Sequence, residues 1–349
     1  MWWLRGDGDS GERGCGGSID GGGGGVAIWC RCGEDGGDEV VTVVALRVSN
    51  YFSSYLINFA ESLKERIDYD EVFAPVARIE AIRLFLAYAS FIGFTVYQMD
   101  VKSAFLYGTI DEEFYLMQPP GFHDPEFPAR VYKVEKAMYG LHQAPRAWYG
   151  TLSKYLLTNS FQRGTIDQTL FIRRHRGDFI LVQVYVDDII FGSSNPQLCR
   201  EFEALMHEKF QISAMVKRIF RYLKGHPKLE LWYHKESLFD FVAYSDSDYG
   251  GASQDRKTTT GGCQFLGKRL ISWQCKKQTI VATSTTEAKY VVAASCYGQV
   301  LWIQNQLLDY GYNFMNTKIY IDNNSAILAV LTSQQWHHFV SAVGTCLHW

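Results

Sequence analysis

The sequence predicts an α+β protein with two folded units within 349 residues. The first unit combines an apolar segment of helical spacing at 76–94 with strand-like runs at 95–101 and 179–192. The second unit begins near Val216 with a basic segment of helical pattern at 216–225. Strand-like runs at 239–245, 262–273 and 318–322 follow, together with a long helical segment from Ser284 onward.

The composition is that of a globular protein, with 47% hydrophobic, 20% charged and 15% aromatic residues. That much apolar material can form sizeable cores, so disorder throughout the chain is excluded. There is no run of about eighteen uncharged apolar residues and no apolar core of a signal peptide, so neither a membrane span nor secretion is expected. Eight cysteines are scattered without a framework spacing, which indicates reduced thiols and an intracellular location, in a cytoplasmic particle or the nucleus.

The two ends of the chain are expected to lie outside the folded units. Residues 1–40 hold 14 of the 31 glycines. This head has little apolar surface to offset the entropy of ordering it, so it should be flexible. Residues 1–67 as a whole form a head without an assigned fold. The tail at 331–349 has no Asp, Glu, Lys or Arg and is also unassigned.

Local patterning accounts for the other elements of the first unit, residues 68–215. The strand at 95–101 carries Asp100 near its end. Turn-forming Pro and Gly residues predict a loop at 118–128, and the segment at 147–161 has the spacing of a helix.

The run at 179–192 carries the strongest chemical motif, because Tyr185-Val186-Asp187-Asp188 lies at the tip of a predicted β-hairpin. With Asp100 from the earlier strand, these aspartates could hold the two divalent ions that nucleotidyl transfer needs, and Mg²⁺ prefers carboxylate and phosphate oxygens. Asp is also common in turns, so the dipeptide alone favours ordinary turn chemistry. Its apolar flanks favour a metal, because two adjacent acids between buried strands are costly without a cation.

Charge is divided unevenly between the two units. Residues 68–215 hold 14 Lys and Arg against 18 Asp and Glu, whereas residues 216–330 hold 14 against 9. The first unit is therefore rich in carboxylates. The second has more basic than acidic side chains, and these could bind along the backbone of a polyanion such as a nucleic acid.

Four segments of the first unit occur together in order: DEVFAPVARIEAIRLFLAYAS, QMDVKSAFLYGTIDEEFYLMQPPGF, KAMYGLHQAPRAWY and VYVDDIIFG. They resemble the reverse transcriptase of copia-type LTR-retrotransposon polyproteins. The resemblance implies a palm with partial fingers in which Asp100, Asp187 and Asp188 are the catalytic ligands of Mg²⁺ or Mn²⁺. It also implies that Phe105 excludes a ribose 2′-hydroxyl and that Gln143 contacts the incoming nucleotide or the template. Without the resemblance, a core aromatic is the simpler interpretation of Phe105.

Three segments of the second unit, residues 216–330, are similar to the RNase H domain of the same polyproteins: AYSDSDYGGASQDRKTTTGGCQFLG, ISWQCKKQTIVATSTTEAKYVVAASC and IYIDNNSAILAV. Hydrolysis of RNA in a hybrid again requires carboxylates around two metals. Asp246 ends a strand, Glu287 opens a helix and Asp322 ends another strand, so the three could converge. The resemblance implies an RNase H-like α/β domain with these three as catalytic metal ligands.

Two of these assignments have simpler alternatives. Ser284 and Glu287 form a capping box, and a Glu at that position often does nothing more than cap its helix. Lys276 and Lys277 beside Trp273 suit a nucleic-acid-binding surface, since basic residues next to aromatics bind nucleic acid. An exposed basic strand end explains the same pattern.

The chain departs from the family in several places. Upstream of Asp68, finger strands that carry basic residues are replaced by the glycine-rich head, and between Met215 and Val216 the thumb is missing. The tail at 331–349 lacks the segment that supplies a fourth RNase H carboxylate. Lys289 stands where the family usually has an acid, at a position that we do not expect to bind metal. These departures suggest a truncated and internally deleted polyprotein portion.

The resemblance implies an RNA-directed DNA polymerase (reverse transcriptase) with RNase H activity on RNA/DNA hybrids, both through a two-metal mechanism. Its partners would be an RNA template, a DNA primer, the RNA/DNA hybrid and deoxynucleoside triphosphates. Loss of fingers and thumb should impair the positioning of these substrates, which can lower a rate by many orders of magnitude. The competing hypothesis is a non-catalytic transposon relic that is at most a weak nucleic-acid binder.

Overall fold

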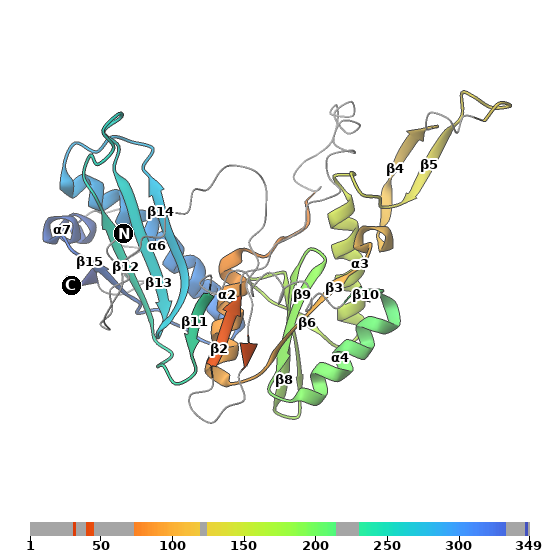
Figure 1. Ribbon diagram of the computed structural model, residues 1–349, viewed down its shortest axis with the longest axis horizontal. Coiled ribbons are helices and arrows are strands. Elements are labelled where there is room, and N and C mark those ends of the chain that lie inside the picture. The colour runs from red at the N-terminus through yellow and green to blue at the C-terminus, as the bar shows by residue number, and fades with distance from the viewer. Residues whose placement is uncertain are drawn as a thin grey trace.

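The computed structural model describes residues 31–32, 40–44, 73–118, 124–213, 230–332 and 346–347. Figure 1 shows two groups of strands with their covering helices, and helix α2 (Ile79–Ile92) lies between them. The mixed α+β class predicted from the sequence is confirmed. Within the described ranges, no helix has the length and apolar character needed to cross a membrane.

The first sheet has six strands in the order β10-β3-β9-β8-β7-β6, and every neighbouring pair is antiparallel. It contains the predicted strand near 95–101 and the predicted hairpin near 179–192. Its strands are β3 (Val96–Val101), β6 (Gln162–Arg163), β7 (Leu170–His175), β8 (Asp178–Tyr185), β9 (Asp188–Ser193) and β10 (Ile212–Ser213).

Alternate residues of the central strands face two different cores. Ile180 and Val182 of β8 belong to the cluster that includes helices α3 (Ala144–Thr158) and α4 (Pro196–Lys209). Leu181, between them in the sequence, belongs to the other cluster, together with α2. Because helices cover both faces, these strands are continuous apolar runs rather than alternating ones.

The second sheet has five strands in the order β14-β13-β12-β15-β16. Strands β12, β13 and β14 are antiparallel neighbours, whereas β15 runs parallel to both β12 and β16. Helix α6 (Thr285–Asp309) packs on this sheet. The other elements are β12 (Phe241–Ser247), β13 (Thr259–Leu266), β14 (Arg269–Lys277), β15 (Lys318–Ile321), α7 (Asn324–Thr332) and β16 (Cys346–Leu347).

The single strand predicted at 262–273 is wrong, because the structure has a hairpin there. Strand β13 ends at Leu266 and β14 begins at Arg269. Gly267 in the connection has φ +62°, a backbone conformation that glycine adopts without steric cost. The sequence RLISWQCKK, which follows Lys268, is the returning strand. The basic helix expected at 216–225 lies outside the described residues.

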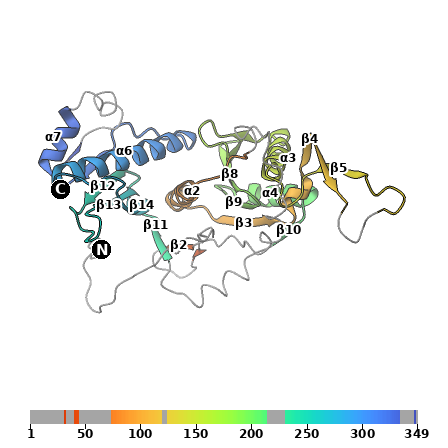
Figure 2. The same cartoon turned by 90° about the horizontal axis from the view of Figure 1, so that it is seen from above.

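Two smaller groups of strands complete the description. Strand β2 (Val40–Val44) pairs antiparallel with both β1 (Arg31–Cys32) and β11 (Glu230–His234). Of the head at 1–40, the structure describes only Arg31, Cys32 and Val40, so the rest of the predicted flexible head lies outside the described residues. Strands β4 (Thr109–Met117) and β5 (Val131–Lys136) form a two-stranded ribbon that projects from the body in Figure 2.

Helix α2 is buried on nearly all sides. Its residues from Ala81 to Ser90 are all buried, although a helix completes a turn in 3.6 residues and cannot show ten of them to one partner. The helix packs against the first sheet and also against β11, β14 and α6. Tyr88, for example, lies 5.0 Å from Tyr310 between ring centroids. A single apolar cluster therefore joins the two units through α2.

A carboxylate at the end of α6 adds a polar connection between the units. The Asp309 side chain accepts hydrogen bonds from the backbone N–H groups of Thr165, Ile166 and Asp167, at 2.8–3.2 Å. Gly164 precedes this loop, and a Cβ atom there would lie 2.7 Å from the Asp309 carboxylate. The loop therefore wraps closely around the acid.

We expect Asp309→Ala to lower the free energy of unfolding by about 2–3 kcal/mol, because three backbone donors lose a charged acceptor. Chemical denaturation of the full chain measures this change. Asp255→Ala is the matched control, since Asp255 pairs with Lys277 at an exposed site, and such pairs contribute little. An equal effect of the two substitutions would show that Asp309 does not join the units.

Candidate active sites

The tip of the β8–β9 hairpin is a two-residue turn that neighbouring elements hold in place. Val186 has φ +56°, which is rare for a β-branched residue and marks a strained position. The Trp148 indole Nε1 donates a hydrogen bond to the carbonyl oxygen of Val186 at 2.7 Å. The backbone N–H of Val101 donates to the carbonyl oxygen of Asp187 at 3.0 Å. Helix α3 and strand β3 thus both fix the turn that carries Asp187.

Pairing of β3 with β9 brings the predicted acids of the first unit together. Asp100 is the direct partner of Asp188 across the two antiparallel strands, so both side chains lie on the same face. Ser213 Oγ donates to Asp100 Oδ2 at 2.6 Å, and Gln98 Nε2 donates to Asp188 Oδ1 at 3.1 Å. Each of these carboxylates is therefore oriented by a neutral donor and keeps its second oxygen for another partner.

The electrostatics of this group are those of buried acids without a counter-ion. Burial raises the pKa of Asp188 to about 7, with further contributions from the charges of Asp187 and Asp100 that outweigh the Gln98 hydrogen bond. Burial, together with the charge of Asp100, also raises the pKa of Asp187. Among the described residues, no Lys or Arg forms an ion pair with any of the three.

This donor set fits a divalent cation. Its oxygen ligands are of the kind that Mg²⁺ and Mn²⁺ prefer, and a bound cation would offset the cost of burying Asp188, which is 5% exposed. In the part of the chain that the structure describes, no three acidic, His or Cys side chains already converge as a metal cluster. Asp100, Asp187 and Asp188 are thus neighbours that repel one another, and the ion would have to draw them together.

Of the two residues predicted to contact the nucleotide, Phe105 is connected to these acids through Tyr139. Phe105 is half-buried, and its ring centroid lies 4.8 Å from that of Tyr139. Burial raises the pKa of Tyr139, and the charges of Asp187 and Asp100 raise it further. Gln143 is the residue before α3 and is partly exposed.

Sequence reasoning missed four side chains around this site: Gln98, Tyr139, Trp148 and Ser213. Two signals were available: Tyr139 and Trp148 belong to the same motif as Gln143, KAMYGLHQAPRAWY, and Gln98 is the first residue of the motif that carries Asp100. Gln98 and Ser213 belong to strands β3 and β10, and only the strand pairing brings them to the acids.

In the second unit, Asp246 and Asp322 lie at the carboxyl ends of the parallel neighbours β12 and β15, a common place for functional groups. A cation already lies between them. Lys289 Nζ is 2.6 Å from Asp246 Oδ1 and 2.5 Å from both oxygens of Asp322. Burial alone would lower the pKa of Lys289, but hydrogen bonds and charges from the two acids outweigh it, and the pKa is raised. Position 289, which we did not expect to bind metal, therefore contacts both acids through its ammonium group.

Glu287, the third acid predicted here, caps its helix. Its Oε2 accepts hydrogen bonds from the backbone N–H and the hydroxyl of Thr283, both at 2.6 Å, and these bonds lower its pKa. Ser284 Oγ accepts in turn from the Glu287 N–H at 3.1 Å, so the serine half of the predicted capping box forms. The Glu287 carboxylate bonds to Thr283, one residue before the N-cap Ser284. Residues 287 and 289 are about 200° apart around a helix, so only one of them can face the acids. With an ammonium present and Glu287 engaged elsewhere, this donor set does not fit divalent ions.

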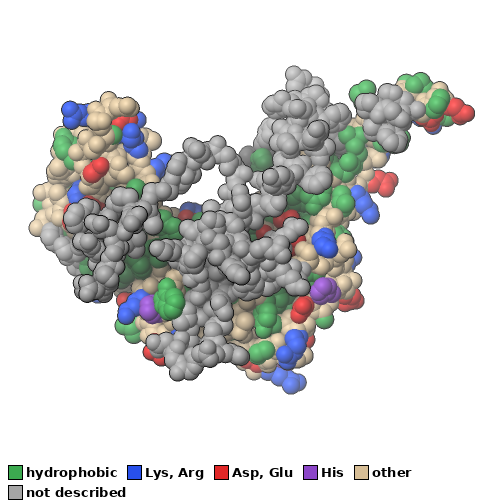
Figure 3. Space-filling model, in the orientation of Figure 1, with side chains coloured by type: hydrophobic (Ala, Val, Ile, Leu, Met, Phe, Trp, Pro, Cys, Tyr) green, Lys and Arg blue, Asp and Glu red, His purple; other side chains and the backbone are tan. Residues whose placement is uncertain are grey.

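The two lysines of the predicted nucleic-acid surface lie at the end of strand β14. Lys276 and Lys277 are exposed on β14, and Lys277 Nζ pairs with Asp255 at 3.2 Å. The Arg83 guanidinium lies 3.8 Å from the centroid of the Trp273 ring and covers one of its faces. On the face shown in Figure 3, the coloured basic side chains are scattered among acidic ones rather than gathered in one patch.

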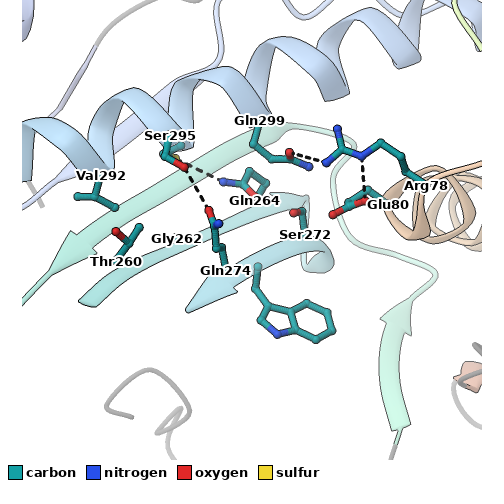
Figure 4. Close-up of a pocket in the computed structure, with 12 residues that line it drawn as sticks. Arg78, Glu80, Thr260, Gly262, Gln264, Ser272, Gln274, Val292, Ser295 and Gln299 are labelled. Carbon is teal, nitrogen blue, oxygen red and sulfur yellow. Dashed lines mark hydrogen bonds and ion pairs between the residues drawn. The ribbon is translucent and has the colours of Figure 1, made fainter. Parts of the chain in front are cut away.

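A cavity of about 220 Å³ lies between the start of α2, strands β13 and β14, and helix α6 (Figure 4). Its polar side chains mostly bond to one another. Arg78 contacts Glu80 at 3.4 Å and donates to Gln299 at 3.1 Å. None of the six predicted catalytic acids lines the cavity, so it is separate from both candidate sites.

We expect Asp188→Asn to flatten the pH dependence of stability in the metal-free protein. A free Asp titrates near pH 4, whereas Asp188 in the folded chain has a pKa of about 7. The folded state therefore binds this proton more tightly, so stability from this group is present below about pH 4 and is lost as the pH rises to about 7.

Urea denaturation with a chelator present, between about pH 5 and about pH 8, measures this loss. The free energy of unfolding should fall with rising pH more steeply in the unmodified chain than in Asp188→Asn. Glu203→Gln, an exposed acid on α4, is the control and should follow the unmodified chain. Identical slopes for all three proteins would contradict the buried-acid interpretation.

Several known proteins are similar to this chain over most of its length. It is 28% identical to the retrovirus-related Pol polyprotein from transposon RE1 of Arabidopsis thaliana, over 79% of this chain and 26% of the relative. The corresponding polyprotein from transposon TNT 1-94 of Nicotiana tabacum is 24% identical over 82% of this chain and 30% of the relative. The chain therefore spans less than a third of the length of these relatives.

Two further comparisons cover shorter parts of the chain. The putative transposon Ty5-1 protein YCL074W of Saccharomyces cerevisiae is 37% identical over 29% of this chain. The sequence profile of the reverse transcriptase (RNA-dependent DNA polymerase) family matches residues 47–225, which include Asp100 and the hairpin tip. That match covers just over half of the chain. The chain therefore belongs to the reverse transcriptase (RNA-dependent DNA polymerase) family, in the form carried by copia-type retrotransposon Pol polyproteins.

Proposed function

We propose that residues 68–215 are the palm of an RNA-directed DNA polymerase that uses Asp100, Asp187 and Asp188 to transfer nucleotides. The observation that carries this proposal is the group of three acids at one sheet end, which has no basic partner in the described structure. Burial raises the pKa values of two of them, Asp187 and Asp188. Such a group is costly to a folded protein unless a cation binds to it. Carboxylates with this environment are typical of functional sites.

The residues around the acids would prepare them for this role. Ser213 and Gln98 each donate a hydrogen bond to one carboxylate oxygen, which limits its rotation. Trp148 holds the carbonyl oxygen of Val186, so the strained turn presents Asp187 in one conformation. Mg²⁺ or Mn²⁺ held by the three acids would activate the primer 3′-hydroxyl and stabilise the pyrophosphate that leaves.

The nucleotide itself would lie against Phe105. We propose that this ring, packed on Tyr139, forms the floor that would clash with a ribose 2′-hydroxyl. Gln143, at the start of α3, would contact the incoming base or the template. The substrates proposed on this basis are deoxynucleoside triphosphates, an RNA template and a DNA primer.

Activity is expected to be weak. The alignment with the RE1 polyprotein extends over 381 positions but covers only 79% of this 349-residue chain. The alignment is therefore longer than the matched part of this chain, so the relative has segments within the aligned region that this chain lacks. A missing thumb is an internal deletion of this kind. Each missing segment would weaken a different substrate contact, and the losses in positioning should compound.

For the second unit we propose descent from an RNase H domain. The two acids at the carboxyl ends of β12 and β15 support this origin. Lys289 opposes hydrolysis of RNA/DNA hybrids, because it neutralises both acids. The alternative, a non-catalytic relic that binds nucleic acid weakly, therefore describes this half better than an active RNase H.

Primer extension on poly(rA)/oligo(dT) with Mg²⁺ or Mn²⁺ tests the polymerase proposal. We expect incorporation barely above background in the unmodified chain, and none after Asp187→Asn. The substitution should leave the fold intact, because it relieves repulsion between neighbouring acids. Glu203→Gln, on the surface of α4, is the matched control and should retain the residual incorporation.

Two outcomes would contradict the proposal. Residual synthesis that survives Asp187→Asn would mean that the hairpin tip is only a turn. Processive synthesis by the unmodified chain would mean that the loss of fingers and thumb has been compensated.

A second measurement locates the metal independently of catalysis. Mn²⁺ should stabilise the unmodified chain against unfolding, and this stabilisation should disappear in Asp187→Asn.

A further inference from the structure

The acids of the second unit surround an ammonium group rather than an open space. The Lys289 side chain is 13% exposed, whereas those of Asp246 and Asp322 are 37% and 34% exposed. The cation is thus the innermost of the three groups, and the carboxylates lie between it and solvent. A lysine at the surface of an acidic patch would instead be more exposed than the acids around it.

The contacts of this ammonium are saturated. Lys has three N–H donors and no acceptor, and Nζ has three carboxylate oxygens within 2.6 Å. Asp246 Oδ1 also accepts from the backbone N–H of Ser247 at 2.6 Å. A divalent ion could reach these oxygens only by displacing the ammonium, which would then remain nearby as a like charge without a partner.

We infer that Lys289 is an internal substitute for a divalent ion, so that the second unit holds its two strand-end acids together without metal. This inference does not depend on the proposed polymerase function, because it concerns other residues. It also identifies position 289, rather than 287, as the point on helix α6 from which a side chain reaches both acids. An acid at 289 would therefore complete a set of three carboxylates.

The full chain tests this inference through Mn²⁺ binding, followed by the electron paramagnetic resonance signal of free Mn²⁺. We expect Lys289→Glu to bind one more Mn²⁺ per chain than the unmodified protein. Adding Asp246→Asn to Lys289→Glu should abolish the gain. Asp246→Asn alone should leave the number of bound ions unchanged, because no ion is bound there in the unmodified chain. Any ion held by the palm is bound by all four proteins, namely the unmodified chain, the two single variants and the double variant. It therefore does not change the differences in Mn²⁺ number between them.

Thermal unfolding supplies a second measurement that does not need a binding signal. With a chelator, Lys289→Gln should melt at a lower temperature than the unmodified chain, because two acids lose their cation. Lys289→Glu should melt lower still, since a third acid is added. Mn²⁺ should raise the melting temperature of Lys289→Glu more than that of the unmodified chain, because only its second unit gains a ligand.

The inference would be overturned if Asp246→Asn removed a bound Mn²⁺ from the otherwise unmodified chain, because that loss would show that metal displaces the lysine. Equal Mn²⁺ stoichiometry in Lys289→Glu and the unmodified chain would also overturn it, provided that circular dichroism shows Lys289→Glu to be folded. If Lys289→Glu does not fold with a chelator, refolding on addition of Mn²⁺ supports the inference, and failure to refold counts against it. The polymerase proposal is tested by primer extension with chains in which Lys289 is unchanged, so its failure is recognised separately from these outcomes.

Discussion

The burial of helix α2 on all sides is the constraint on which the arrangement of the two units depends. A surface helix would have paired its apolar stripe with one sheet and left the other face to water. Here Ala81 to Ser90 are buried in succession, so the first sheet and the second unit share one apolar cluster. The loop around Asp309 then fixes the far end of α6 against the first unit by charged hydrogen bonds.

The two groups of acids differ in how their charge is balanced. Among the described residues, Asp100, Asp187 and Asp188 have only neutral donors, and burial raises the pKa values of the latter two. Asp246 and Asp322 have an ammonium between them. The first group is poised to bind a cation, whereas the second already contains one. The same chain thus combines an unneutralised site and a neutralised site, in units of common transposon origin as we propose.

Local sequence patterns were sufficient for much of the architecture. The apolar spacing of 76–94, the β-rich runs around the Asp pair and the capping box at Ser284 each predict an element that the structure contains. These signals are local, because helix periodicity, hairpin turns and caps depend on residues within a few positions of one another. The hairpin at Gly267 was missed, since a lone glycine within an apolar run does not by itself separate a turn from a bulge.

By itself, the sequence determined the class of the fold, the position of the hairpin tip and the membership of Asp100, Asp187 and Asp188 in one motif set. Only the tertiary structure decided which side chains surround them, because Ser213 and Trp148 approach through strand pairing and helix packing across long sequence separations. It also decided between Glu287 and Lys289, two residues apart in the chain. The rotation of α6 about its own axis, relative to its sheet, turns Lys289 toward the acids, while Glu287 stays at the helix cap. No local sequence pattern encodes that rotation.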